Sequence, residues 1–170
     1  ILDVGCAGSY LHCRLIREGA KVVGVDYRRF ERRDPELAFI ISDITRMPFK
    51  DDCFDAVIAV SVVEHVGLGY YDDPNRPGGD RLAFEEIIRV SKPSAPNIIS
   101  VPFAEERQID WQRQYDESSL RRLVRGSHIL AEEFFTYVKK GRYAKVPSNM
   151  VRGVGVALLK LTKGEDDDVL

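Results

Sequence analysis

The feature that most constrains this chain is its opening stretch, Ile1 to Ser9 (ILDVGCAGS). A short apolar run with β-branched residues is typical of a buried parallel strand. Gly5 and Gly8 then allow a tight turn and a close approach of the backbone to a ligand. The helical pattern from Tyr10 to Glu18 would aim its first NH groups at whatever lies over the turn. The stretch therefore predicts a strand, a glycine turn and a helix that together border a ligand site.

A second short apolar run, Lys21 to Asp26, ends in an acid that lies 21 positions after Gly5. In nucleotide-binding βαβ units, a carboxylate about 20 residues beyond the glycine turn binds the ribose hydroxyls. A carboxylate accepts hydrogen bonds from both hydroxyls, so the residue type suits that task. Asp26 is therefore predicted to bind ribose, with a solvated acid at a strand end as the alternative.

Three more apolar runs predict strands: Phe39 to Ile44, Phe54 to Ser61 and Asn97 to Phe103. Helices are predicted from Asp80 to Ser91, where apolar residues follow helical spacing, and from Ser118 to Arg125, capped by Asp116. Strands that alternate with helices indicate a parallel sheet with helices on both faces. Ligands of such sheets bind beyond the carboxyl ends of the strands.

Two strand-like runs, Leu130 to Val138 and Gly155 to Thr162, close the chain. The link between them is rich in Gly, Pro and basic residues and shows no helical pattern. It predicts a hairpin-like return that adds one antiparallel strand to a mostly parallel sheet. The expected fold class is therefore α/β, doubly wound, with one antiparallel strand near the C-terminus.

Length and composition describe a single globular domain. The 170 residues are 44% apolar and 31% charged. A net charge of −2 gives no global attraction to nucleic acid or to an anionic membrane. No apolar run approaches the ~20 residues of a membrane span, and three scattered cysteines suit a reducing, cytoplasmic setting. We expect a domain over residues 1–163 and an acidic tail over 164–170, with an N-terminal segment missing before Ile1.

The ordered set of motifs resembles the class I S-adenosylmethionine (SAM)-dependent methyltransferases. The resemblance is carried by these segments: Asp3 to Gly8, Gly24 to Asp26, Ser42 to Ile44, Phe54 to Val57, Ser61 to His65 and Ile87 to Pro93. It is strong from residue 1 to about 103. It implies a seven-stranded Rossmann-like sheet with one antiparallel strand near its end, and SAM as the cofactor. One departure is Ser94-Ala95-Pro96, where many members carry Gly-Gly after Lys-Pro.

Carried over to this chain, the resemblance implies a role for each motif residue. The backbone of Gly5, Cys6, Ala7 and Gly8 would pass beneath the methionine part of SAM, and Asp3 would orient that turn. Asp26 would bind the ribose, with Tyr27 beside the adenine. Asp43 and the Ile44 NH would contact the adenine edge, and the Ser61 carbonyl would meet the methionine ammonium.

The segment from Glu64 to Pro74 follows the fourth strand, where the family places substrate-facing residues. Loops of this length are usually functional. His65 is the candidate general base, because imidazole titrates near neutrality; packing within the loop is its alternative. Glu64 is predicted to anchor this substrate loop, from the loop itself or from behind the residues that touch the substrate. Tyr70, Tyr71 and Asp72 would line the acceptor pocket or pack the loop.

Other functions are weighed against methyl transfer. Cys6, His12 and Cys13 do not form a directed ligand set, so no metal is expected. Arginine clusters at 28–33 and 121–125 could contact phosphate, which makes a nucleic-acid substrate an alternative. Against it, Ser61-Val62-Val63-Glu64 stands where amino-directed nucleic-acid methyltransferases carry Asn-Pro-Pro-aromatic. A nicotinamide-dependent oxidoreductase would need Gly-x-Gly-x-x-Gly, which Gly5 to Gly8 does not match. A non-catalytic SAM-binding or partner-binding domain remains an alternative.

The sequence therefore predicts a cytoplasmic SAM-dependent methyltransferase. Its expected acceptor is a small molecule or a glycan precursor, methylated on oxygen. The acceptor itself and the oligomeric state are left open.

Overall fold

The structure is a computed structural model that describes residues 1–29, 34–71 and 73–164. The acidic tail from Glu165 to Asp168, the candidate residue Asp72 and the arginines at 32 and 33 lie outside the described residues.

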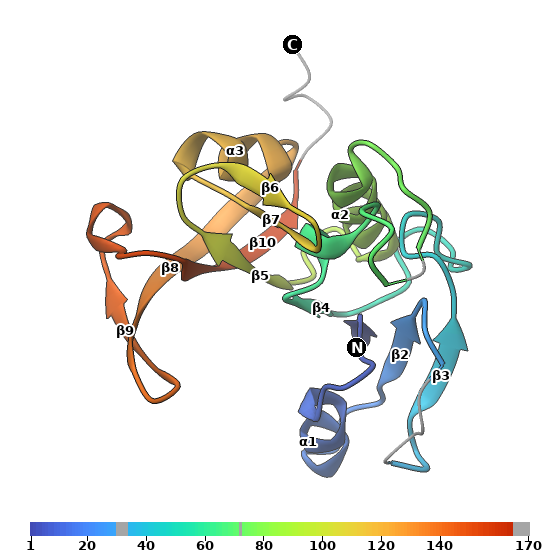
Figure 1. Cartoon of the computed structure of the whole chain (residues 1–170). Helices are drawn as coiled ribbons and strands as arrows, with labels where there is room; N and C mark the ends of the chain where they lie inside the picture. The colour runs from blue at the N-terminus through green and yellow to red at the C-terminus, as the bar shows by residue number, and fades with distance from the viewer. Residues whose placement is uncertain (30–33, 72, 165–170) are drawn as a thin grey trace.

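Five parallel strands form the half of the sheet that carries the glycine turn (Figure 1). They are β1 (Leu2–Val4), β2 (Val23–Asp26), β3 (Ala38–Ile41), β4 (Val57–Val60) and β5 (Asn97–Phe103), in the order β3-β2-β1-β4-β5. The runs are short and apolar because both faces of such a strand are covered. The strand order reverses direction between β1 and β4, and this switch point is where doubly wound sheets bind ligands.

The C-terminal half of the sheet contains β8 (Ser127–Lys139), β9 (Arg142–Val146) and β10 (Gly155–Lys163). β10 lies between β5 and β8 and runs antiparallel to both, and β9 runs antiparallel to β8. The predicted fold class, α/β with a mostly parallel sheet, is confirmed. The strand count differs, because the structure has eight strands in this sheet and two of them are antiparallel to the rest. The link that was predicted to make a hairpin-like return turns at Lys140-Gly141, and its residues Arg142–Val146 pair with β8 as an extra strand.

In the part of the chain that the structure describes, three α-helices cover the sheet. α1 (Leu11–Arg17) lies on one face, and α2 (Gly79–Val90) and α3 (Glu117–Leu123) lie on the other (Figure 1). The apolar side of α2 is inside, with Ala83, Phe84, Ile87 and Val90 each at most 1% exposed. Burying each of the larger side chains stabilises the fold by about 1.5–3 kcal/mol. No helix among the described residues is long and apolar enough to cross a membrane.

The start of α3 is fixed by a reciprocal cap. The Asp116 carboxylate accepts from the Ser119 backbone NH at 2.8 Å, and the Asp116 NH donates to the Ser119 hydroxyl at 2.9 Å. Hydrogen bonds to the charged form lower the pKa of Asp116, first of all the one from the Ser119 NH. We expect Asp116→Ala to reduce the free energy of unfolding by about 1 kcal/mol, measured by urea denaturation. Asp116→Asn should retain most of it, and equal losses in both variants would contradict the cap.

A short hairpin connects β5 to α3. It consists of β6 (Arg107–Ile109) and β7 (Gln112–Gln114). The 3₁₀ turn η1 (Val63–His65) follows β4, and a second 3₁₀ turn, η2 (Ser148–Met150), follows β9. β7 contacts η1, so the hairpin lies against the segment that follows β4.

Candidate functional site

A cavity of about 640 Å³ opens at the carboxyl edge of the parallel strands. It is bordered by the glycine turn after β1, the residues that follow β2, β3 and β4, and part of the segment from His65 to Asp73. Its volume is typical of small-molecule and cofactor sites. Its position is the one that the strand order predicts.

Most of the residues predicted from the sequence line this cavity. The cofactor-binding candidates among them are Gly5, Ala7, Gly8, Asp26, Tyr27, Asp43, Ile44 and Ser61, and the substrate-side candidates are His65 and Tyr71. Asp3, Cys6, Glu64 and Tyr70 do not line it. The first three are buried beneath it, and Tyr70 is 58% exposed at the surface. Glu64 and Tyr70 are therefore better described as neighbours of the cavity than as its walls.

The glycine turn requires its glycines for two different reasons. Gly5 has a φ of +70°, and a Cβ there would overlap the side chain of Val62. Gly8 has a φ of +89°, and a Cβ there would meet no atom within 4 Å. The turn is thus packed against the end of β4 on one side and leaves backbone exposed to the cavity on the other.

Asp26 is held in place by the turn that it faces. Its Oδ2 accepts from the Ala7 NH at 2.9 Å, and its Oδ1 accepts from the Arg28 NH at 2.9 Å and from Arg28 Nε at 3.3 Å. The residue is 4% exposed, and the part that remains accessible borders the cavity. A carboxylate oxygen accepts two hydrogen bonds, so Oδ2 keeps acceptor capacity beyond the bond from Ala7.

Asp43 lies past the end of β3 and is similarly fixed. Its Oδ1 accepts from the Thr45 NH at 2.8 Å and from the Thr45 hydroxyl at 2.7 Å. Its Oδ2 lies 3.3 Å from Arg76 Nη1, which also donates to the Thr45 hydroxyl. This arrangement keeps a carboxylate at the cavity while Arg76 balances its charge.

Asp3 and Cys6 are buried next to the cavity without lining it. Asp3 Oδ2 lies 3.4 Å from Nδ1 of His12 on α1, and both side chains are almost completely buried. Burial raises the pKa of Asp3 to about 6, against the lowering effect of His12. The Cys6 side chain packs on Gly24, and burial raises its pKa to about 12, so the thiol is inert.

Two aromatic rings from the segment after β4, His65 and Tyr71, line the cavity, and Trp111 packs on His65 without lining it. The His65 ring stacks on Trp111, with centroids 5.4 Å apart and 17° between the planes. Tyr71 meets the same imidazole edge-on at 5.3 Å. His65 Nδ1 lies 2.6 Å from the Trp111 carbonyl, which can only accept, so Nδ1 carries the proton and Nε2 has the free lone pair. Burial lowers the pKa of His65, and the imidazole is therefore neutral at pH 7.

Glu64 lies behind this imidazole. It is 1% exposed, its Oε1 is 3.6 Å from His65 Nε2, and its Oε2 has no hydrogen-bond partner among the residues that the structure describes. Burial raises the pKa of Glu64 from 4.5 to about 7. Arg113 donates to the Val66 carbonyl at 2.7 Å and lies 3.6 Å from Asp80, which locks the strand β7 against this segment. The carboxyl group is thus neutral or ionised according to pH near 7.

This pKa makes the stability of the fold depend on pH. Between pH 4.5 and 7 the folded chain holds a proton on Glu64 that the unfolded chain has released, so stability falls as the pH rises through this window. We expect Glu64→Gln to match the wild type at pH 5 and to be about 2 kcal/mol more stable at pH 8.5, because the amide cannot ionise. Thermal denaturation at both pH values measures this, with Glu85→Gln on the exposed side of α2 as the control. A gain of equal size at both pH values would show that the carboxyl does not titrate as described.

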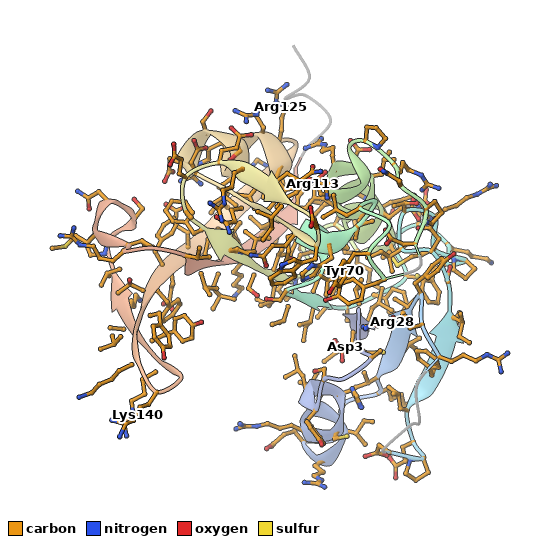
Figure 2. All side chains as sticks on the ribbon, viewed as in Figure 1. Asp3, Arg28, Tyr70, Arg113, Arg125 and Lys140 are labelled. Atoms are coloured by element: carbon orange, nitrogen blue, oxygen red, sulfur yellow. The ribbon has the colours of Figure 1, made fainter. Side chains whose placement is uncertain are left out.

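Several residues at or beside the cavity were not identified as candidates from the sequence: Ser9, Leu11, Arg28, Val60, Val62, Val66 and Asp73 in its lining, and Trp111 beside it. Trp111 comes from the β6–β7 hairpin, 46 positions beyond His65, and no local pattern marks it. Arg28 appeared only as part of a basic cluster, but it binds Asp26 and its guanidinium lies 4.8 Å from the Tyr71 ring centroid. Its position two residues after Asp26 was the available signal. Figure 2 shows Arg28 and Tyr70 close to the sheet edge.

The residues present fit SAM. The open side of Gly8 leaves room for a ligand against the backbone, and Asp26 Oδ2 keeps acceptor capacity at the cavity. Tyr27 and Ile44 add apolar surface at the ends of β2 and β3. This combination of a carboxylate acceptor, an exposed glycine backbone and apolar walls suits a nucleoside with an amino-acid chain.

The fold and the cavity define a nucleotide-binding α/β domain. The sequence matches the methyltransferase domain family over residues 2–99. The chain therefore belongs to the class I SAM-dependent methyltransferase family, and the predicted family and cofactor are both confirmed.

Curated relatives match part of the chain. It is 34% identical over 97 residues to a demethylmenaquinone methyltransferase of Beutenbergia cavernae. This match covers 51% of this chain and 40% of that protein. It is also 30% identical over 124 residues to the mitochondrial ubiquinone biosynthesis O-methyltransferase of Rattus norvegicus. That match covers 62% of this chain and 35% of the rat protein. The chain thus spans less than half the length of both relatives.

Solved structures share the fold over nearly the whole chain. The 1,6-didemethyltoxoflavin-N1-methyltransferase of Burkholderia thailandensis, solved with S-adenosylhomocysteine, superposes with a TM-score of 0.70 at 16% identity and covers 96% of this chain and 70% of that one. The [4+2]-cyclase SpnF also superposes with a TM-score of 0.70, at 17% identity, covering 96% and 73%. At such identities the likeness concerns the fold alone.

Proposed function

We propose that this chain transfers the methyl group of SAM to a hydroxyl group of a small aromatic molecule. The observation that carries the proposal is the lining of the cavity. One part of the lining presents the glycine turn and Asp26, and another presents Tyr71 and His65, with Trp111 stacked on His65 outside the lining. The first part suits a nucleoside cofactor, and the second suits a flat acceptor with a proton to lose.

On the cofactor side, SAM supplies a sulfonium-bound methyl group that reacts by in-line displacement. Asp26 would bind the ribose hydroxyls, and Tyr27, Asp43 and Ile44 would hold the adenine. The backbone of Gly5 to Gly8 and the Ser61 carbonyl would hold the methionine part. Ser61 has a φ of +52°, an unusual value for a serine, and its NH donates to the Ser100 carbonyl at 3.1 Å, which fixes the turn after β4.

On the acceptor side, Tyr71 and the His65–Trp111 pair offer aromatic surface, which favours a planar ring. Two relatives are named as a demethylmenaquinone methyltransferase and a ubiquinone biosynthesis O-methyltransferase, and quinones contain a planar ring. Their names support an acceptor with a flat ring. The glycan precursor that the sequence also allowed is the alternative. The net charge of −2 gives no support to a nucleic-acid acceptor.

Catalysis would come chiefly from alignment, because the leaving group is good and a dry, oriented acceptor reacts readily. A hydroxyl acceptor must also lose its proton. His65 is neutral at pH 7 and would take up this proton at Nε2 as the base, and the ionised form of Glu64, with Oε1 3.6 Å from Nε2, would stabilise the imidazolium that forms. We place this reaction in the cytoplasm.

The experiment is a transfer assay with radiolabelled SAM and three acceptor classes: substituted catechols and quinols, nucleotide sugars, and transfer RNA. We expect label in the first class and none in the other two. Label in the sugars alone would favour the glycan precursor. SAM binding without transfer to any class would favour a non-catalytic binding domain.

A further inference from the structure

A hairpin arm leaves the body of the fold beyond β10. We define the arm as residues 134–154, which contain the end of β8, all of β9 and η2. The last residue of β8 that pairs with β10 is Phe135, whereas β8 and β9 stay paired as far as Lys139 and Arg142. The tip is therefore a two-stranded ribbon with no third strand, closed by Lys140 and Gly141, both with positive φ. Figure 2 shows Lys140 at this tip, far from the other labelled residues.

The arm carries positive charge without compensation. Residues 134–154 contain no Asp or Glu, and they contain five basic residues: Lys139, Lys140, Arg142, Lys145 and Arg152. Lys145 is the one of these with an acidic partner among the described residues, Glu133 at 2.6 Å. The net charge of −2 for the whole chain therefore conceals a local cationic surface.

Apolar and aromatic side chains accompany this charge. Tyr137 and Tyr143 face each other across the ribbon with centroids 5.6 Å apart, and they are 49% and 52% exposed. Val138, Met150 and Val154 are 55%, 58% and 44% exposed. Tyrosine rings among basic residues are typical of protein surfaces that enter the headgroup region of a bilayer, where one end of the ring is apolar and the other wet.

The direction of the arm relates it to the cavity. β8 and β5 both run antiparallel to β10, so β8 runs parallel to β5 and to the strands that end at the cavity. The tip at Lys139 therefore follows the same topological end of the sheet as Gly5, Asp26 and Ser61, but the twist of the sheet turns β8 away from β2 and β3 (Figure 1). No residue of the arm lines the cavity, so docking of the tip would leave the cavity lining uncovered by the arm itself.

We propose that the arm docks on the surface of an anionic phospholipid bilayer. Its basic residues meet the headgroup phosphates, and Tyr137, Tyr143 and Val138 enter the interface. The exposed aliphatic side chains favour a bilayer over a nucleic acid, because valine and methionine do not stack on bases. This inference goes beyond methyl transfer and does not depend on it.

The test is co-sedimentation of the full chain with vesicles of phosphatidylcholine alone and of phosphatidylcholine with phosphatidylglycerol. We expect the chain to bind the anionic vesicles and to bind the neutral ones at least tenfold more weakly. It should be released in about 0.5 M NaCl, because salt at that concentration screens charges that are more than a few ångströms apart. The variant Lys139→Gln/Lys140→Asn/Arg142→Gln should lose at least tenfold in partitioning. Asparagine is chosen at position 140 because it tolerates the positive φ.

The matched control removes three exposed charges elsewhere, in Arg14→Gln/Arg17→Gln/Lys21→Gln, and should bind within twofold of the wild type. Tyr137→Ser/Tyr143→Ser should weaken binding while the salt dependence remains. No vesicle binding, or equal loss in the control, would overturn the proposal. So would binding of a single-stranded RNA oligonucleotide, or arm-dependent dimerisation by light scattering, in the absence of vesicle binding.

Discussion

Asp26→Ala is expected to weaken the binding of S-adenosylhomocysteine by about 10- to 150-fold, which corresponds to about 1.5–3 kcal/mol. The magnitude is that of hydrogen bonds to a charged group. The Asp26 carboxylate is almost buried and is fixed by the Ala7 and Arg28 backbone NH groups, so the ligand hydroxyls would meet an acceptor that is already in position. Titration calorimetry of the wild type and the variant measures the change.

The control for this variant is Asp55→Ala. Asp55 is an exposed acid that pairs with Lys92 at 2.6 Å and does not line the cavity. Its loss should leave the affinity unchanged. Asp26→Asn keeps an acceptor oxygen and should lose less than Asp26→Ala. If Asp26→Ala stays folded by circular dichroism and binds like the wild type, the ribose assignment is wrong.

His65→Asn is expected to reduce the rate of methyl transfer to a hydroxyl acceptor by about 10²–10⁴-fold, the usual contribution of a general base. Asparagine can still donate to the Trp111 carbonyl, as Nδ1 of the imidazole does, but it offers no basic lone pair in place of Nε2. The wall of the cavity is thereby kept while the base is removed. Single-turnover kinetics with saturating acceptor measure the chemical step.

The pH profile separates a base from a structural role. Burial lowers the pKa of His65, so the wild-type rate should fall in acid as the imidazole takes up a proton. Ionisation of Glu64, whose pKa is about 7, should add a second change in rate near neutrality, which Glu64→Gln removes. His65→Asn should lack the acidic limb, and its affinity for S-adenosylhomocysteine should stay within threefold. A variant with full activity would show that alignment alone drives the reaction.

The first half of the fold was predictable because its signals are local. The strands β1, β2, β4 and β5 are apolar runs, and the turn at Gly5 to Gly8 and the acid at Asp26 are read from spacing. α3 begins where Asp116 predicts it, one residue before the expected range. The cavity then follows from the rule that parallel strands bind ligands at their carboxyl ends.

The other parts depend on contacts between distant residues. The β6–β7 hairpin, Arg107–Gln114, is polar and has no strand pattern, and it is ordered by Arg113, which binds the Val66 carbonyl and Asp80. Trp111 reaches His65 only because this hairpin folds back. Glu64 was predicted to anchor the loop rather than to face the acceptor. The 3₁₀ turn at Val63–His65 directs consecutive side chains about 120° apart, so Glu64 lies inside and His65 lies at the cavity.

The central claim is that SAM lies across the glycine turn with its ribose at Asp26. A crystal structure of the chain with S-adenosylhomocysteine tests it most directly. The account predicts density along Gly5 to Gly8, with both ribose hydroxyls within 3.2 Å of the Asp26 carboxylate, a normal hydrogen-bond distance. Density elsewhere, or a ribose turned away from Asp26, would contradict it.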